Sequence, residues 1–322
     1  MKRVDTKIKI LKILELNDFG VTQIALKLKL SNQIIHRYIK DLLANKFILQ
    51  KGEAPHTVYS LNQEYKYTRI QTDFIFARKK ILPSFLKKYI KFNLPDINRA
   101  DYILDFMLQS SAVYSSNIEG VSIDLNSFIN SQKLSKGVQK EVSEVNDLVE
   151  AYSLAKLNKL NQKNFLKSHG LLSRHILSKA RQGRYRSEGV GVFGQEGLVY
   201  SAPEGFLVQN EMRILFEIID ELLVKKMSDA EVVFWSSWLH LEIALIHPFL
   251  DGNGRAARLL EKWFLVEKKN ETIWSLQTEH YYFQNRPKYY ANLRKTDNYW
   301  EADFVNFNNF IKLLFDFFLE YK

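Results

Sequence analysis

Apolar residues recur every three or four positions along most of the chain, which predicts a mainly helical protein. In the first part of the chain this spacing predicts a helix near residues 8–14, a second over 21–28 and a third over 31–44. The third helix has one apolar face, made of Ile34, Ile35, Tyr38, Ile39, Leu42 and Leu43. Residues 47–61 then follow the pattern of a strand, a turn and a second strand.

The polar face of the predicted third helix carries short polar and basic side chains: Asn32, Gln33, His36, Arg37 and Lys40. Three helices followed by a hairpin resemble a winged helix-turn-helix, whose recognition helix enters the major groove of DNA. The resemblance implies a small domain over residues 1–62 with DNA as its partner. A helical module that binds protein, or only dimerises, is the alternative for this pattern.

The charge of the chain favours the DNA interpretation of this first domain. The 322 residues carry a formal net charge of +10. Residues 1–60 contain eleven Lys and Arg against five Asp and Glu, so six of the ten charges lie there. A compact basic module on a near-neutral body indicates an anionic partner for the module.

The rest of the chain, residues 63–322, forms a second predicted domain that is mostly helical. Its helix-length periodic runs are 65–92, which has a basic face, 98–117, 138–157, 162–179, 208–225 and 229–247. A further apolar stripe near the C-terminus predicts a core helix and leaves a homodimer interface open; it consists of Phe304, Phe307, Ile311, Leu314, Phe315 and Phe318.

One segment of this second domain, residues 183–203, predicts a β-hairpin, because apolar residues alternate among five glycines. Gly189, Gly191 and Gly194 fit the pattern GxGxxG. That pattern binds dinucleotides only between a strand and a helix, whereas here a second strand and Pro203 follow. We therefore exclude a dinucleotide-binding fold, and no GxxxxGK[ST] phosphate loop is present.

The composition excludes several classes of chemistry. The chain has no cysteine, so disulfides, thiolate metal sites and cysteine nucleophiles are excluded. The N-terminus has no apolar segment typical of a signal peptide. The most apolar run, residues 232–250, is interrupted by His240, Glu242 and His247, which indicates a buried helix rather than a membrane span. We expect a cytoplasmic protein without membrane contact.

The most informative segment leads from an apolar helix through a Gly-Asn-Gly loop into another helix, HPFLDGNGRAAR over residues 247–258. Backbone N–H groups at such a helix start bind phosphate, and Arg255 and Arg258 add charge on one helix face. Asp251 can hold Mg²⁺ between phosphate oxygens, and His247 can act as a base near neutral pH. These are the components of nucleotidyl transfer.

This string matches the pattern HxFx[DE]GNGRxxR at every fixed position, and on it the chain resembles the Fic domain family, most of whose members transfer AMP from ATP to a protein hydroxyl. The resemblance covers roughly residues 70–300. It includes the hairpin at 183–203, which looks like the family's target-docking flap, and Asn285-Arg286 and Tyr289-Tyr290 downstream. It implies a mainly α Fic fold with a β-hairpin flap.

The resemblance also implies roles for individual residues. His247 would be the general base that deprotonates a Tyr, Thr or Ser hydroxyl, and Asp251 would hold Mg²⁺ on the α- and β-phosphates of ATP. The target segment would dock on the flap by strand addition. The implied nucleotide-binding residues are Gly252, Asn253 and Gly254 as the phosphate cradle, Arg255 for the departing charge, Arg258 for the γ-phosphate and Tyr281 against adenine.

A second string, Ser115–Gly120, fits the family's inhibitory motif [ST]xxxE[GN] within a helix expected over about 108–120. In the family this glutamate, here Glu119, pairs with the second arginine, here Arg258. A carboxylate there repels the γ-phosphate and misaligns the α-phosphate, and misplacement by about an ångström can cost ~10²-fold in rate. Ser115 and Glu119 are therefore expected to form a brake. Whether Glu119 also supports AMP removal stays open.

Two functions from different classes follow. The first is an autoinhibited protein adenylyltransferase that uses ATP and Mg²⁺ and modifies a target protein or itself. The second is a DNA-binding regulator in which the Fic fold serves as a nucleotide sensor. The sequence also leaves open transfer of another group, such as UMP, phosphate or phosphocholine.

Overall fold

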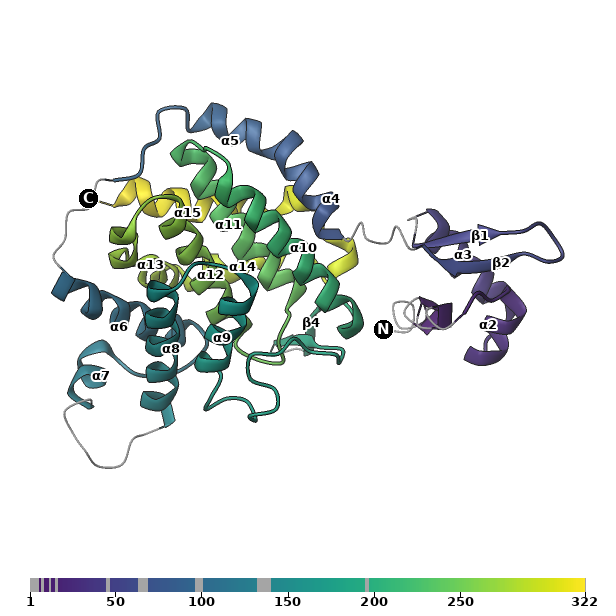
Figure 1. The fold of residues 1–322 in the computed structure, drawn as a ribbon, viewed down its shortest axis with the longest axis horizontal. Helices are drawn as coiled ribbons and strands as arrows, with labels where there is room; N and C mark the ends of the chain where they lie inside the picture. Colours follow the sequence, from purple (N-terminus) through teal and green to yellow (C-terminus); the bar gives the residue numbers. More distant parts are fainter. Residues whose placement is uncertain are drawn as a thin grey trace. The chain divides into compact units, whose positions relative to one another are not determined.

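The computed structural model describes residues 6, 9–11, 13–14, 17–44, 47–62, 69–95, 101–131, 140–194 and 197–321. The chain divides into two units, Met1–Thr68 and Arg69–Lys322 (Figure 1). Each unit is described by itself.

The first unit packs short helices against a two-stranded sheet. Its labelled elements are α2 (Val21–Leu28), α3 (Asn32–Ala44), β1 (Ile48–Lys51) and β2 (Val58–Leu61). The strands are antiparallel, with Ile48 opposite Leu61, and residues 9–11 and 13–14 are also helical. The core combines apolar side chains from each element, among them Ile10, Leu14, Ile24, Ile35, Ile39, Leu42, Ile48 and Tyr59.

The order of helices and hairpin in this unit is the one that the periodicity predicts, while its assignment to the winged-helix class stays a prediction. Helix α3 begins at Asn32, and the Ser31 hydroxyl caps it by accepting from the Ile34 N–H at 3.4 Å. Ile34, predicted for the apolar face, is exposed in this first turn.

The second unit is a bundle of helices with one β-hairpin. Its first helical elements are α4 (Arg69–Phe76), the π-helical η1 (Ala77–Ile81), α5 (Leu82–Lys88), α6 (Asp101–Ile118), α7 (Leu125–Ser131), α8 (Lys140–Leu157) and α9 (Gln162–Leu172). The hairpin follows as β3 (Gly191–Gly194) and β4 (Gly197–Ser201). The remaining elements are α10 (Gly205–Val224), α11 (Asp229–Ile246), α12 (Asn253–Lys268), η2 (Glu271–Ser275), α13 (Thr278–Gln284), α14 (Arg286–Leu293), η3 (Tyr299–Glu301), η4 (Phe304–Phe307) and α15 (Asn308–Glu320).

Helix α11 forms the centre of this bundle. Nearly every side chain from Ala230 to Ile246 is buried, as expected of a helix that is apolar all round. It packs against α12, α10, α5 and α15. The C-terminal stripe predicted as a core helix is buried along η4 and α15.

Helix α9 is shorter than the predicted run of 162–179. It ends at Leu172, where the Ser173 hydroxyl donates to the His169 carbonyl at 2.6 Å and competes with the next helical hydrogen bond. Two residues later, the His175 N–H donates to the Asp147 carboxylate of α8. The freed segment then leads toward the hairpin.

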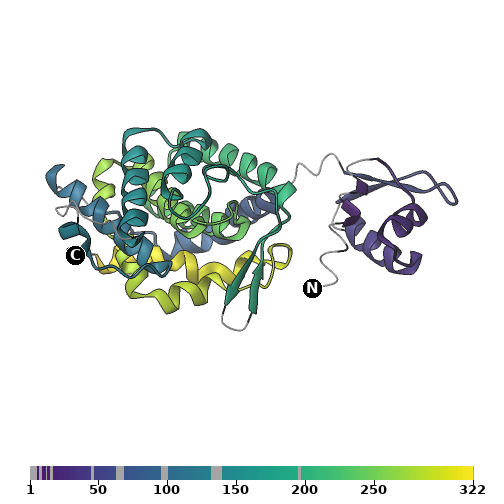
Figure 2. The ribbon, with the colours of Figure 1, turned by 90° about the horizontal axis from the view of Figure 1, so that it is seen from below.

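Strands β3 and β4 pair antiparallel, with Gly191 opposite Ser201 and a register shift between Val192 and Phe193. Figure 2 shows them as a two-stranded arm that extends from the helices. The tip residues predicted as a turn, Gln195 and Glu196, lie outside the described residues. Gly189, Gly191 and Gly194 therefore belong to a hairpin, which agrees with excluding a dinucleotide-binding turn.

Within the described ranges, no helix combines the length and the apolar character that crossing a membrane requires.

Candidate active site

The backbone places His247 at a sharp turn after α11. His247 has φ 49° and ψ 59°, in the left-handed region, and its N–H still donates to the Ile243 carbonyl at 2.9 Å. The following Pro248 disfavours a right-handed helical conformation at His247. A non-glycine residue in this region costs roughly 1–2 kcal/mol, so surrounding contacts hold the turn in place. The ring lines a cavity of about 320 Å³.

Arg186 supplies most of those contacts. Its buried guanidinium donates to four carbonyls: those of Ile246 and His247 at the end of α11, and those of Glu188 and Pro203 at the base of the hairpin. Its own N–H donates to the Pro248 carbonyl at 3.0 Å. Arg186 therefore neutralises the C-terminal end of α11 and ties it to the flap. Burial lowers the pKa of Arg186 to about 10, so it remains charged near neutral pH.

The loop after His247 is held by the side chain of Asn253. Its amide accepts from the Phe249 N–H at 2.8 Å and donates to the Phe249 carbonyl at 2.9 Å. The buried Phe249 ring stacks on His169 of α9, with the ring centroids 3.5 Å apart. Asn253, expected in the phosphate cradle, thus commits its side chain to the loop and can offer a phosphate only its backbone N–H.

His169 fixes the other end of this loop. Its Nε2 lies 3.0 Å from the Asp251 carbonyl, and its Nδ1 accepts from the Gly183 N–H at 3.1 Å. The Gly183 contact sets the tautomer, so Nε2 carries the proton and donates to Asp251. Burial lowers the pKa of His169 to about 4, which keeps the ring neutral.

Gly252 precedes α12 with φ 80°. A Cβ at this position would lie 2.8 Å from the Leu172 side chain, so glycine is required both for the backbone conformation and for the space. The exposed Asp251 carboxylate accepts from the Gly252 N–H at 2.6 Å. Among the described residues no group of three or more His, Asp or Glu forms a metal site; Asp251 is a single oxygen donor beside the helix start.

The start of α12 is covered by Glu119. A Cβ built on Gly254 would lie 2.2 Å from the Glu119 carboxylate, so the carboxylate rests on the first turn of the helix. Glu119 Oε1 also accepts from Arg258 Nη2 at 2.6 Å. The Arg258 side chain is buried while that of Glu119 is 30% exposed. Glu119 therefore occupies the positive end of α12 from the cavity side.

The register between α6 and α12 aligns this contact with two others. Lys262 donates to the Ser111 hydroxyl at 2.7 Å, and Arg258 donates to the Ser115 hydroxyl at 2.8 Å. Residues four apart lie on one helix face. The pairs 111–262, 115–258 and 119–254 are thus successive steps of an antiparallel ladder. We call it the α6–α12 ladder; it brings Ser115, Glu119 and Arg258 together as the inhibitory motif implies.

Electrostatics distinguish His247 from Glu119, the imidazole and the carboxylate that line the cavity. Burial lowers the pKa of His247 to about 4, and the nearby Arg186 charge acts in the same direction. Burial by itself would raise the pKa of Glu119, but the Arg258 guanidinium outweighs it and holds that pKa below its usual value. Near neutral pH the site therefore combines a neutral imidazole with an ionised carboxylate.

Arg255, expected to face a phosphate, points toward α8. Its Nη1 lies 3.3 Å from the Glu144 carboxylate. Its Nε is buried without a hydrogen-bond acceptor among the described residues. The guanidinium thus keeps one unused donor beside the loop.

The aromatic lining of the cavity comes from the hairpin and from α14. Tyr281 does not line it; the ring packs edge-on against Phe317 of α15, and its hydroxyl lies 3.3 Å from the Glu320 carboxylate. Helix α13 turns this side chain toward α15, while the next helix faces the cavity. The lining residues include Val192, Val199 and Tyr200 from the hairpin, and Arg286, Tyr289, Tyr290 and Arg294 from α14 and its end.

Sequence reasoning missed Arg186 and His169. Both act on backbone groups of a distant loop, and neither belongs to a motif. The one signal for Arg186 is its place among Arg181, Arg184 and Arg186 just before the hairpin, which gives no hint that one of the three is buried.

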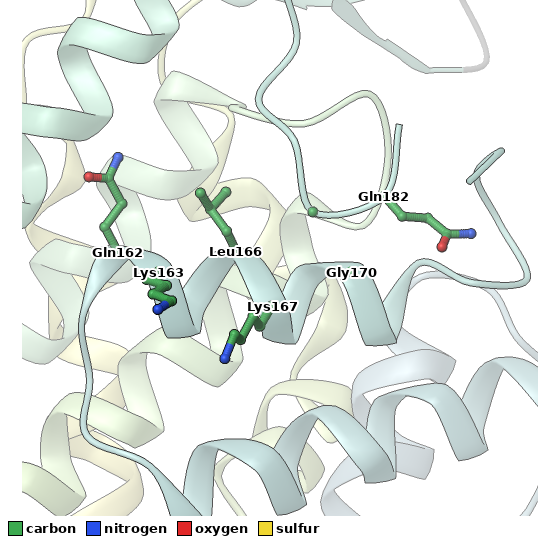
Figure 3. A pocket seen from close by; sticks show the side chains of 7 residues that line it. Gln162, Lys163, Leu166, Lys167, Gly170 and Gln182 are labelled. Carbon is green, nitrogen blue, oxygen red and sulfur yellow. The ribbon is translucent and has the colours of Figure 1, made fainter. Parts of the chain in front are cut away.

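A second hollow, of about 530 Å³, is open and lies along α9 (Figure 3). Gln162, Lys163, Leu166 and Lys167 line it from the helix, and Gln182 lines it from the facing loop. No lining residue is acidic or a histidine, and none is shared with the His247 cavity.

Comparisons with known proteins find similarity over part of the chain. Residues 159–265 match the Fic/DOC family model. A probable protein adenylyltransferase of Aquifex aeolicus is 34% identical over 113 residues, which is 35% of this chain and 30% of that protein. The chain thus spans about three tenths of the length of this curated relative.

Solved structures support the fold. A Fic family protein from Desulfovibrio desulfuricans G20 superposes with a TM-score of 0.59 at 24% identity, over 79% of this chain and 74% of that one. Fic-1 from C. elegans gives a TM-score of 0.50 at 18% identity, over 92% of this chain and 82% of that one. The matched segment runs from α9 through the loop to α12, so it is this part of the chain that is similar to the Fic/DOC family.

Proposed function

We propose that the chain is an autoinhibited protein adenylyltransferase, which transfers AMP from Mg-ATP to a Tyr, Thr or Ser hydroxyl of a target protein or of itself. The observation that carries the proposal is the Glu119 carboxylate, which lies on Gly254 and pairs with Arg258 at 2.6 Å beside the cavity of His247. The start of a helix next to an arginine is a place that favours a phosphate, and here the Glu119 carboxylate occupies it.

In this proposal His247 accepts the proton of the attacking hydroxyl. Its Nδ1 faces the Ala244 carbonyl at 3.4 Å, which favours a proton on Nδ1 and leaves Nε2 to act as the base. The hydroxyl oxygen bonds to the α-phosphorus, the bond between that phosphorus and the bridging oxygen to the β-phosphate breaks, and pyrophosphate leaves. The α12 N–H groups and Arg258 bind the phosphate oxygens, with Arg255 beside them.

The chemistry of Asp251 fits Mg²⁺, which commonly takes one carboxylate and completes its shell with water and substrate phosphates. The carboxylate is exposed next to the α12 start. When bound there, the ion would neutralise charge on the phosphates. Asp251 would hold it, and the His169 hydrogen bond to the Asp251 carbonyl would keep that residue in position.

The flap supports docking of an extended target segment. Val192 and Val199 line the cavity on the hairpin side, and the Tyr200 hydroxyl donates to the Leu245 carbonyl at 2.5 Å just before His247. A strand paired to the hairpin edge would bring its hydroxyl to the cavity through backbone hydrogen bonds, whatever its sequence.

The proposal is tested by labelling protein with radiolabelled ATP. Replacement of Glu119 by glycine frees Arg258 and the α12 start. Labelling should rise about 100-fold, because a misplacement of the reacting phosphate by about an ångström can cost that factor in rate. Replacement of the exposed Asp124 by glycine is the matched control and should leave labelling at the wild-type level. Equal labelling by wild type and Glu119→Gly would contradict the brake.

Addition of His247→Ala to Glu119→Gly should abolish labelling while ATP binding survives. Labelled UTP, GTP and CTP, run in parallel, report whether another nucleotide is transferred. Incubation of AMP-modified protein with wild type and Glu119→Gly reports whether Glu119 also supports AMP removal.

A DNA-binding regulator that uses the Fic fold as a nucleotide sensor is the second candidate. The observation that favours it is the exposed face of α3, where Gln33, His36, Arg37 and Lys40 point away from the core. A gel shift with genomic fragments, with and without ATP, separates it from the first candidate, since only a sensor would change DNA affinity with ATP in the absence of protein labelling.

A further inference from the structure

The first helices of the second unit expose a run of lysines that the proposed transfer reaction does not use. Helices α4, η1 and α5 follow one another along the outer edge of the body (Figure 1). Their buried face is mainly apolar and, besides the buried Asp73, consists of Ile70, Phe74, Ala77, Ile81, Leu82 and Phe85. The opposite face is exposed and carries Lys79, Lys80, Lys87 and Lys88, with Lys91 in the turn that follows. We call these five residues the lysine stripe.

The local charge excess is large. Residues 78–91 contain six Lys and Arg and no Asp or Glu. This excess equals that of the first sixty residues, so the rest of the chain is slightly acidic overall. The positive charge of the protein is therefore concentrated in two segments, of which only the first was evident as a domain.

Arg78 is the one cation of this segment with an acidic partner in the described part of the chain, Glu221 of α10 at 2.9 Å. None of the five stripe lysines lies within salt-bridge distance of a described carboxylate. Like charges gathered without counter-charges repel one another and weaken the folded state. Such a cluster is consistent with an anionic partner outside the chain.

Neither the helix dipole nor a membrane surface accounts for the whole stripe. The positive charge favoured at a helix C-terminus explains Lys87 and Lys88 in the last turn of α5, but not Lys79 and Lys80 earlier in the run. Insertion into a membrane surface needs a continuous exposed apolar face, whereas the apolar face of these helices is buried and the exposed large apolar side chains of the segment are the separate Ile75 and Ile90.

We propose that the lysine stripe binds the phosphate backbone of nucleic acid. From Lys79 to Lys88 the run extends roughly 14 Å at helical rise, which matches about four phosphates of one strand. Lysine contacts to phosphates position a protein without reading sequence. The stripe therefore adds affinity for any duplex, independently of α3 and of nucleotide transfer.

The test uses the full chain and a labelled duplex of mixed sequence, with binding followed by fluorescence anisotropy from about 50 to 200 mM salt. The variant replaces all five stripe lysines with glutamine. The matched control replaces five exposed lysines elsewhere, Lys159, Lys167, Lys179, Lys226 and Lys295. Each lost phosphate contact lowers the slope of log affinity against log salt by about 0.9, so the stripe variant should show a slope smaller by about 4 and at least tenfold weaker binding at low salt.

The control variant should match wild type in both quantities, and circular dichroism melts establish that both variants fold. A slope that the stripe substitutions leave unchanged would overturn the proposal, as would binding that disappears on replacing Arg37 and Lys40 of α3 alone. Binding of wild type to phosphatidylserine vesicles but not to the duplex would overturn it in favour of a membrane surface.

Discussion

The His247 ring stays neutral because it is buried next to the Arg186 charge, which lowers its pKa to about 4. A base with that pKa keeps its lone pair far below neutral pH. We expect labelling by Glu119→Gly to remain constant from pH 8 to about 5 and to fall only below that. A fall centred near pH 6.5, the value of an unperturbed histidine, would contradict the burial of this ring.

Arg186 acts on His247 only through the backbone, and this makes it a positioning residue. Lysine keeps its charge but cannot donate in the planar arrangement that reaches four carbonyls. In the Glu119→Gly background, Arg186→Lys should lower kcat about 100-fold, the cost of displacing a reacting group by an ångström. The KM for ATP should change little.

Arg184 provides the matched control, because it lies two residues away and is exposed. Arg184→Lys should leave kcat unchanged. If Arg186→Lys raised KM and left kcat intact, Arg186 would serve binding rather than the position of His247.

The candidate site could be predicted from the sequence where its residues are contiguous. The loop from His247 to Arg258 is a single string, so its composition alone indicated phosphate chemistry. Arg186 and His169 come from other elements and hold backbone atoms, which no spacing rule detects. The sequence also indicates the pair Tyr281-Tyr282 without showing which way α13 turns Tyr281, and a contact of Tyr281 with adenine stays a prediction.

At the scale of elements, the α6–α12 ladder predicts how the proposed brake can be weakened in steps. Ser115 accepts from Arg258 Nε through its hydroxyl and from Nη2 through its carbonyl at 2.9 Å. Ser115→Ala removes the first of these bonds, worth about 1 kcal/mol, and leaves the Glu119 pair in place. Labelling should rise about fivefold, well below the rise for Glu119→Gly.

Ser116 is a stringent control for this step. It is buried beside Ser115, but its hydroxyl has no hydrogen-bond partner in the described part of the chain. Ser116→Ala should leave labelling unchanged. Equal effects of the two substitutions would point to general loosening of α6 instead of a specific latch.

Element boundaries followed from the sequence where an apolar face runs the whole length, as in α8 and α11. The spacing over-extended α9, because the hydrogen bonds that end it involve Ser173 and the distant Asp147. The antiparallel register of α6 and α12 could not be predicted from the sequence either. Each helix repeats its face every four residues, and the sequence does not show which residues of one helix lie opposite which residues of the other.

At the scale of the whole molecule, a buried acidic cluster links stability to pH. Burial raises the pKa of Asp73 to about 6 and that of Glu211 to about 7, and it also raises the pKa of Glu242 well above its usual value. Arg69 is the cation among them, 2.5 Å from Asp73 and 3.8 Å from Glu242. These carboxyls hold protons more tightly in the folded chain than in the unfolded one.

The contribution of these carboxyls to the free energy of unfolding is fully present below pH 4, and it is lost as the pH rises through about 6 to 7. Urea midpoints of wild type and Glu211→Gln should therefore diverge between pH 5 and 8, with the variant losing less stability by about 2 kcal/mol. Glu217→Gln, exposed on the same helix α10, should track wild type. Parallel curves for Glu211→Gln and wild type would refute a protonated Glu211.

Glu119 and Arg258 belong to one chain, so the effective concentration of the Glu119 carboxylate at the α12 start is set by the fold. Dilution cannot separate the pair. The fraction of molecules in which Glu119 has left Arg258 is therefore independent of the protein concentration. The activity of the proposed enzyme can then change in two ways. A ligand can compete with the Glu119 carboxylate for the start of α12, or a displacement of α6 can break the contacts of the α6–α12 ladder.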